Sequence, residues 1–261
     1  MSIDLPLTIA EGAAPQLQLI QPDWPAPARV QAYSTMRQQG YSCGVYAGLN
    51  LALHVGDESL HVEKNRQLLR RTLGLVNEPL WLNQVHQKRV VNAAAHFQQI
   101  AEADASFTDQ PGNACVVMTA DCLPVLFCNK QGSKVAAAHA GWRGLVAGVL
   151  EATVQAMHEP ADEIIAWLGP AIGAEAFEVG EEVREAFVMQ HSSSEAAFCV
   201  TRAGHYLADI YQLARIILQA AGVQNISGGG FCTFNDADQF YSYRRDGTTG
   251  RQASLIWLGE N

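Results

Sequence analysis

The amino-acid sequence predicts an α+β fold in a single domain over residues 1–261, with layers of mixed β-sheet flanked by helices. Short runs rich in β-branched and aromatic residues alternate with longer segments of helical periodicity. Residues 114–118 and 124–128 are too close for a helical crossover, whereas other runs flank predicted helices, so the sheet should be mixed. No repeat, low-complexity tract or long linker divides the chain.

Four segments have the apolar spacing of amphipathic helices. Asp57 can cap the first one and Gly74 ends it, because glycine adopts the left-handed conformation that closes many helices. Pro160 stops the second helix, and Gly222 follows the last. The predicted helices cover residues 57–74, 142–157, 181–189 and 209–221.

Six short runs are predicted as strands, because they are rich in valine, isoleucine, phenylalanine and tryptophan and are bounded by turn-forming residues. They cover residues 81–85, 114–118, 124–128, 134–139, 164–169 and 254–258.

Composition excludes several classes of protein. The chain has 26 acidic and 17 basic residues, and its formal net charge of -9 disfavours general nucleic-acid binding. No stretch reaches the length of about 20 apolar residues that spans a bilayer, and the N-terminus lacks the basic region of a signal peptide. Six cysteines without a CxxC pair indicate a reducing compartment, so we expect a cytoplasmic protein with no membrane partner.

Three potential metal ligands follow predicted strands, namely His86, Cys122 and His139. Two imidazoles and one thiolate suit a catalytic zinc that keeps its fourth position for water or substrate, and the same set also suits copper. The alternative interpretation is that each residue is an isolated side chain in the protein interior. Spacing alone does not decide between these interpretations, because ligands that meet only on folding leave no local signature.

Motifs along most of the chain carry a more specific signal. From about residue 40 to the C-terminus the sequence resembles the laccase-domain family, which is also described as polyphenol-oxidase-like, as purine nucleoside phosphorylases of the multicopper type and as peptidoglycan editing factor. The first 30 residues match nothing recognisable, and Gln87 stands where the family commonly has glycine. The matching motifs are GLNLALHVGD (48–57), NQVH (83–86), ADAS (103–106), MTADCLPVLF (118–127), AAHAGWRGL (137–145), LGPAIG (168–173), FEVG (177–180) and FYSYRRDGTTGR (240–251).

The resemblance implies a metal-dependent enzyme that acts on purine nucleosides. It carries the family's metal-binding histidine, cysteine and histidine onto His86, Cys122 and His139, which would then be the catalytic and metal residues. The implied reactions are phosphorolysis of adenosine, inosine, guanosine and methylthioadenosine, and deamination of adenosine. A zinc ion can activate water for deamination, whereas phosphorolysis needs a cationic pocket for phosphate.

Two features could hold the phosphate. Arg143, Arg244, Arg245 and Arg251 are candidates, although tandem arginines are more often solvated or salt-bridged. The second feature is the start of the helix after His139, where Gly141 could serve a tight turn instead of, or together with, an anion site.

Polar residues in the matching motifs could contact the substrate or move protons. Asn50 and His54 could line the substrate pocket, although a loop asparagine more often bonds its own backbone. Asp121 and Glu178 could relay protons, and the sequence does not choose between them. The other five histidines and the other five cysteines lie outside these arrangements and are expected to have no catalytic role.

Other functions compete with the nucleoside enzyme. A copper-dependent polyphenol oxidase needs paired histidines for a trinuclear cluster, and this chain has eight histidines and no H-x-H. A cysteine hydrolase that edits peptidoglycan precursors, removing a wrongly added amino acid from UDP-MurNAc, would use Cys122 as nucleophile and His139 or His86 as base. A purine-binding or partner-binding module would bind nucleoside without turnover. The expected state is a monomer or small homo-oligomer.

Overall fold

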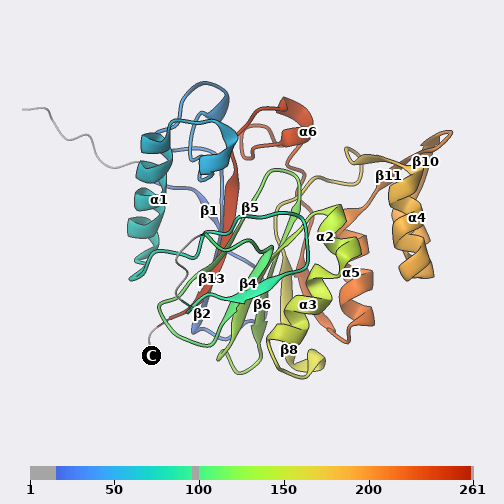
Figure 1. The fold of residues 1–261 in the computed structure, drawn as a ribbon, viewed down its shortest axis with the longest axis horizontal. Coiled ribbons are helices and arrows are strands. Elements are labelled where there is room, and N and C mark those ends of the chain that lie inside the picture. Colours follow the sequence, from blue (N-terminus) through green and yellow to red (C-terminus); the bar gives the residue numbers. More distant parts are fainter. Residues whose placement is uncertain (1–15, 96–99, 260–261) are drawn as a thin grey trace, which may run out of the picture.

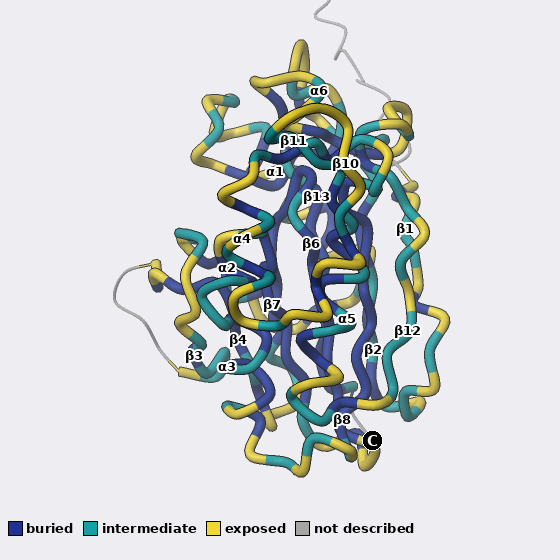
Figure 2. The backbone as a smooth tube through the Cα atoms, turned by 90° about the vertical axis from the view of Figure 1, so that its right-hand side faces the viewer, coloured by how far each residue is buried: buried dark blue, intermediate teal, exposed yellow. Residues whose placement is uncertain are grey.

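Two β-sheets packed face to face form the centre of the protein, and helices cover both outer faces (Figure 1). The structure is a computed structural model that describes residues 16–95 and 100–259. Residues from both sheets meet in an apolar layer that includes Val117, Leu126, Ala137 and Ile256. The order of layers is therefore helix, sheet, sheet, helices. In Figure 2 the buried strands, drawn in dark blue, run through the centre of the molecule.

The first sheet has four strands, all antiparallel, in the order β1-β2-β13-β5. Its outer face packs against one helix, α1 (Ser59–Leu73), through Leu68 and Leu69. The strands are β1 (Leu19–Ile20), β2 (Val30–Thr35), β5 (Cys115–Thr119) and β13 (Gln252–Leu258).

The second sheet has six strands in the order β12-β8-β6-β7-β4-β3. The outer pairs β12–β8 and β3–β4 are parallel, and the inner pairs are antiparallel, which confirms the predicted mixed sheet. The strands are β3 (Val90–Asn92), β4 (Ala105–Thr108), β6 (Leu123–Asn129), β7 (Val135–Ala140), β8 (Ile164–Leu168) and β12 (Asn225–Gly228).

Three helices cover the outer face of the six-stranded sheet: α2 (Trp142–Ala147), α3 (Val149–Ala156) and α5 (Ile210–Ala220). The prediction of one helix over 142–157 is wrong, because Gly148 has φ 90° and breaks it in two. The prediction for α5 is confirmed, and the side chain of Asp209 accepts hydrogen bonds from the amides of Tyr211 and Gln212.

A small lobe extends from the side of the molecule that carries α5 (Figure 1). It consists of a three-stranded antiparallel sheet in the order β10-β11-β9 and one predicted helix, α4. Its elements are β9 (Glu178–Gly180), α4 (Glu181–Gln190), the 3-10 helix η4 (Ser192–Ala197), β10 (Phe198–Arg202) and β11 (His205–Ala208). Among the described residues, no helix is long and apolar enough to cross a bilayer.

Short elements in the connecting loops lie at the end of the molecule where the functional side chains gather. They are the 3-10 helices η1 (Gly44–Tyr46) and η2 (Leu53–Val55) and the helix α6 (Tyr243–Asp246). The 3-10 helix η3 (Ala161–Glu163) lies at the opposite end, where β8 begins beside the end of β6. The side chain of Ser242 caps α6 by accepting a hydrogen bond from the amide of Arg245.

Two further predictions differ from the structure. Residues 81–85 form no strand, and the segment has only an isolated bridge at Asn83, with another at Leu80 just before it. The prediction that Asp57 caps α1 is wrong, because Glu58 occupies the N-cap position of this helix. The Asp57 carboxylate accepts hydrogen bonds from Ser42 and Asn50 instead.

Candidate metal centre and surrounding pocket

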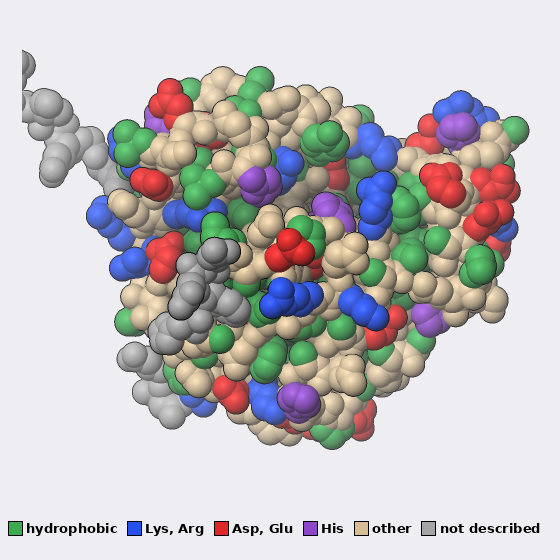
Figure 3. Space-filling model, in the orientation of Figure 1, with side chains coloured by type: hydrophobic (Ala, Val, Ile, Leu, Met, Phe, Trp, Pro, Cys, Tyr) green, Lys and Arg blue, Asp and Glu red, His purple; other side chains and the backbone are tan. Residues whose placement is uncertain are grey.

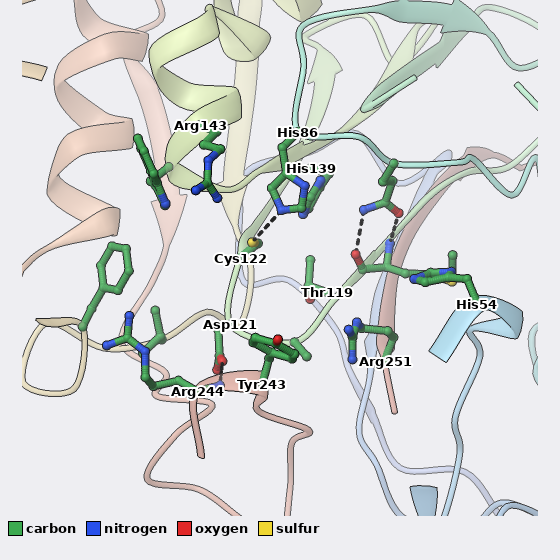
Figure 4. Close-up of a pocket in the computed structure, with 16 residues that line it drawn as sticks. His54, His86, Thr119, Asp121, Cys122, His139, Arg143, Tyr243, Arg244 and Arg251 are labelled. Carbon is green, nitrogen blue, oxygen red and sulfur yellow. Dashed lines mark hydrogen bonds between the residues drawn. The ribbon is translucent and has the colours of Figure 1, made fainter. Parts of the chain in front are cut away.

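The candidate residues gather at one end of the two packed sheets, around a cavity of about 390 Å³ (Figure 4). In Figure 3 histidines and basic residues surround a hollow on the face toward the viewer. The cavity is lined by His54, Gln84, His86, Met118, Thr119, Ala120, Asp121, Cys122, His139, Trp142, Arg143, Ile172, Phe177, Tyr243, Arg244 and Arg251.

His86, Cys122 and His139 form one cluster in this cavity, because their ligand atoms all lie within 4.8 Å of one another. The distance between Cys122 Sγ and His86 Nε2 is 3.7 Å. His86 lies in a loop, Cys122 in the turn just before β6 and His139 near the end of β7, so only folding brings them together. Two nitrogen donors and one sulfur donor with open space beside them match the ligand set of a catalytic metal site.

Asp104 fixes the orientation of two of these residues, a role that was not predicted from the sequence. Its buried carboxylate is 2.8 Å from His139 Nδ1, which leaves His139 Nε2 for the cluster. The backbone amides of Val85, His86 and Gln87 also donate to this carboxylate at 2.8–3.1 Å. The sequence feature that could have pointed to Asp104 is the ADAS motif. Asp104 is the only carboxylate in the two matched segments 83–86 and 103–106.

Charges within the cluster shift the pKa of Cys122 and that of His139. Burial by itself would raise the pKa of Cys122, but the charge of His139 and hydrogen bonds from both imidazoles lower it to about 6. Burial would lower the pKa of His139, but the charge of Cys122 and the hydrogen bond to Asp104 raise it to about 9. The cluster therefore favours the thiolate, which is the form of cysteine that binds metals.

Gly141 lies so close to the cluster that there is no room for a side chain at this position. Its backbone is extended, with φ −65° and ψ 161°, so the conformation suits any residue and the alternative of a glycine-dependent turn is wrong. A Cβ atom at this position would lie 2.8 Å from Cys122 Sγ and 2.9 Å from His86 Cδ2. Neither contact is tolerated without moving a candidate ligand.

We therefore expect Gly141→Ala to reduce metal content at least tenfold at limiting metal, because a displaced ligand weakens the site. Metal analysis after equilibration with a metal buffer measures this. Gly173→Ala is the matched control, since its Cβ would lie 3.0 Å from the sulfur of Cys232, outside the cluster. Equal metal content in Gly141→Ala and the wild type would contradict the argument.

Three of the four candidate arginines line the cavity, namely Arg143, Arg244 and Arg251. Within residues 16–95 and 100–259, none of the three forms a salt bridge with a carboxylate. Arg244 Nη1 donates to the carbonyl of Glu178, and Arg251 Nη1 donates to two carbonyls, so both guanidinium groups retain free donors. The cavity is thus positively charged although the whole chain is acidic.

The prediction that Arg245 binds substrate does not agree with its position. Its guanidinium donates to the carbonyls of Thr233, Phe234 and Phe240 and pairs with Asp246. These bonds hold the loop before α6 against the helix, outside the lining of the cavity.

Asn50 and His54 also differ in their positions. Asn50 is fully buried, bonds the backbone of Ala52 and accepts from the amide of Arg251, so it supports the pocket and does not line it. His54 lines the cavity as predicted. Burial, and then the charges of Arg251 and Arg66, lower the pKa of His54 and favour its neutral form.

The two candidate proton relays are placed differently as well. Asp121 lines the cavity, has φ 90°, and accepts hydrogen bonds from Thr233 Oγ1 and the amide of Arg244, both at 2.7 Å. Glu178 does not line the cavity, because its carboxylate pairs with Arg202 in the lobe. Of these two carboxylates, only that of Asp121 therefore belongs to the cavity lining.

The remaining histidines and cysteines have no place in the cavity. His61, His158, His191 and His205 do not line it, and His96 lies outside the described residues. Burial raises the pKa of Cys115 and of Cys128 to about 12, which makes both thiols inert. Cys43 and Cys199 are exposed, and Cys232 is half-buried away from the cluster.

Comparison with known proteins identifies relatives over almost the full length. The purine nucleoside phosphorylase PA4543 of Pseudomonas aeruginosa is 55% identical over 240 residues, which cover 92% of this chain and 98% of that protein. The purine nucleoside phosphorylase YfiH of Escherichia coli is 54% identical over 241 residues, covering 92% and 99%.

Solved structures agree with the fold. The crystal structure of Neisseria meningitidis protein NMB0706 superposes with a TM-score of 0.90 at 51% identity, covering 93% of this chain and 99% of that one. The sequence profile of the family described as multi-copper polyphenol oxidoreductase laccase matches residues 31–259. The chain thus belongs to the laccase-like family of multi-copper polyphenol oxidoreductases, as its motifs predicted.

Proposed function

We propose that the protein is a metal-dependent purine nucleoside phosphorylase that also deaminates adenosine. In phosphorolysis a phosphate oxygen forms a bond to the ribose C1′ while the bond from C1′ to the base breaks. The products are ribose 1-phosphate and the free base, which takes up a proton. The observation that carries the proposal is the juxtaposition of the His86, Cys122 and His139 cluster with cationic side chains in one cavity. The names of the relatives support the same reaction.

His86, Cys122 and His139 would hold the metal, and zinc fits their two imidazoles and one thiolate better than a multinuclear copper centre does. Within the described residues, these three are the one group of histidines, cysteines and carboxylates close enough to bind an ion together. A zinc ion bound there would act as a Lewis acid and lower the pKa of a coordinated water, as deamination requires. Copper at the same three residues is the alternative.

Phosphate would bind to the arginines that face the cavity. Arg143 and Arg244 lie on one wall and Arg251 on the opposite side of the cluster (Figure 4). Guanidinium groups without carboxylate partners attract an anion and can stabilise charge that develops during phosphorolysis. The aromatic rings of Trp142, Phe177 and Tyr243 in the same lining offer surfaces on which a purine can stack.

One observation favours a second function. The lowered pKa of Cys122, beside His139, is typical of a nucleophilic thiolate and suits a cysteine hydrolase acting on peptidoglycan precursors. Such an enzyme would be active without metal and would not need phosphate. The reduced cysteines and acidic composition suit a cytoplasmic location for either enzyme.

Phosphate dependence tests the proposed function directly. We expect release of hypoxanthine from inosine and of adenine from adenosine to rise with inorganic phosphate, with ribose 1-phosphate formed in equal amount. Chromatography of the reaction mixture measures all of these products. Equal base release without phosphate would identify hydrolysis, and no consumption of any nucleoside would overturn the proposal.

Arg244→Ala should weaken phosphorolysis about tenfold to hundredfold, because a charge-assisted hydrogen bond is worth about 1.5–3 kcal/mol. Deamination of adenosine uses no phosphate and should be retained in this variant. Arg202→Ala is the control, since Arg202 pairs with Glu178 in the lobe. Rates at several phosphate concentrations separate the two reactions. Equal loss of both activities, without recovery at high phosphate, would place the phosphate elsewhere.

A further inference from the structure

Thr119 is one of the residues that line the cavity, and its side chain carries a buried hydroxyl without a partner in the described part of the chain. The residue is 1% exposed, and among the described residues no protein group forms a hydrogen bond with its Oγ1. It lies between the cluster and Arg251 in Figure 4. Buried hydroxyls are nearly always hydrogen-bonded, so an unpaired one at a cavity wall points to a bond made with a ligand.

The fold fixes the direction of this hydroxyl. Alternate residues of β5, Cys115 and Val117, face the layer between the two sheets, and Thr119 is the next residue on that face. The strand β7 repeats the pattern with Ala137 and then His139. Thr119 and His139 therefore lie at the boundary between the apolar layer and the cavity.

Thr119 is also rigid, which suits a binding residue. It is paired with Gln252 in the ladder between β5 and β13, so its backbone is fixed. Its side chain is branched at Cβ, and few side-chain rotamers are open to such a residue in a strand. A hydroxyl held in this way loses little conformational entropy when it binds an oxygen atom.

We propose that Thr119 forms a hydrogen bond to an oxygen of the bound substrate, a ribose hydroxyl or a phosphate oxygen. This rests on the proposed function, because a purine nucleoside and inorganic phosphate both bring such oxygens into the cavity. A hydroxyl can donate to a phosphate oxygen and can donate to or accept from a ribose hydroxyl. The competing interpretation is that Thr119 only fills space, as valine would.

The test compares Thr119→Val, which keeps the shape and removes the hydroxyl, with Thr119→Ser, which keeps the hydroxyl. We expect kcat/KM for inosine phosphorolysis to fall at least tenfold in Thr119→Val and to recover in Thr119→Ser. Stability to urea should not fall in Thr119→Val, because no bond within the protein is lost. Ser194→Ala is the control, since Ser194 has a buried, unpartnered hydroxyl in η4 of the lobe.

Further measurements identify the oxygen. A raised KM for inosine would assign the bond to a ribose hydroxyl, which is the 2′-hydroxyl if the KM for 2′-deoxyinosine is unaffected. A raised KM for phosphate would assign it to phosphate. Wild-type kinetics in Thr119→Val would overturn the inference while leaving the proposed function intact. If the wild-type protein releases no base, the proposed function fails, and calorimetric titrations with inosine and with phosphate then decide. If inosine and phosphate each bind Thr119→Val as tightly as they bind the wild type, the inference is overturned in that case too.

Discussion

Replacing Cys122 with alanine is expected to abolish metal binding and nucleoside turnover together. Cys122 supplies the one thiolate of the cluster, and its lowered pKa means that this ligand is charged at neutral pH. Two neutral imidazoles alone bind a divalent ion weakly, so we expect metal content below a tenth of the wild-type value after equilibration in the same buffer. Metal analysis and the inosine assay on the same preparation measure both effects.

Two controls make this result specific to the cluster. Cys232→Ala removes a half-buried thiol outside the cluster, and His158→Ala removes an imidazole that does not line the cavity. Both variants should retain wild-type metal content and turnover. Wild-type metal content in Cys122→Ala would refute the three-residue site, whereas lost turnover with undiminished metal would favour the nucleophilic cysteine.

Asp104→Asn is expected to have the second largest effect, on both stability and metal affinity. The carboxylate accepts hydrogen bonds from His139 Nδ1 and from three backbone amides, and an asparagine at this position would present an NH₂ group to some of these donors. Breaking a buried charged network typically costs about 3–5 kcal/mol, and loss of a bond that orients a metal ligand costs about tenfold to hundredfold in affinity. Urea unfolding and metal titration measure the two losses.

The stability contribution of Asp104 should depend on pH in a defined direction. Burial would raise its pKa, but the hydrogen bond from His139 and those from the amides outweigh burial and lower it. A carboxyl group with a lowered pKa stabilises the folded state above its unfolded pKa of about 3.9, and the contribution is lost as pH falls through the folded value. The difference in unfolding free energy between wild type and Asp104→Asn should therefore be full at pH 7 and shrink in acid.

The exposed carboxylate of Asp109 provides the control for this prediction. Asp109→Asn should leave stability within about 0.5 kcal/mol of the wild type, as is usual for surface substitutions. A loss of stability in Asp104→Asn that did not exceed this control would show that the carboxylate is dispensable. Unchanged metal affinity would show that His139 is oriented by its packing instead.

The elements that the sequence predicted well are those with a strong local signal. The helix α5 was predicted from its apolar spacing and from the glycine that follows it. The strands β5, β6, β7, β8 and β13 were predicted from runs of apolar, β-branched and aromatic residues. The strands missed were mostly short or half-exposed, such as β3 and β9, where composition differs little from that of a loop.

The partners of each strand were decided only by the tertiary structure. The strands β5 and β6 follow one another after a short turn, yet they lie in different sheets. Asp121 makes this possible with φ 90°, a conformation that is strained for a residue with a side chain and that two hydrogen bonds to its carboxylate stabilise. No local sequence pattern predicts such a turn.

The sequence by itself determined the fold class, the family and, through the family motifs, which histidines and which cysteine meet. Only the tertiary structure decided how these residues are supported and which polar groups face the cavity. Asp104 bonds a histidine that is 35 positions away, and Arg245 bonds carbonyl groups of the preceding loop while Arg244 faces the cavity. The physical reason is that a polar side chain takes the partners that folding brings within hydrogen-bond distance, and sequence separation does not encode that distance.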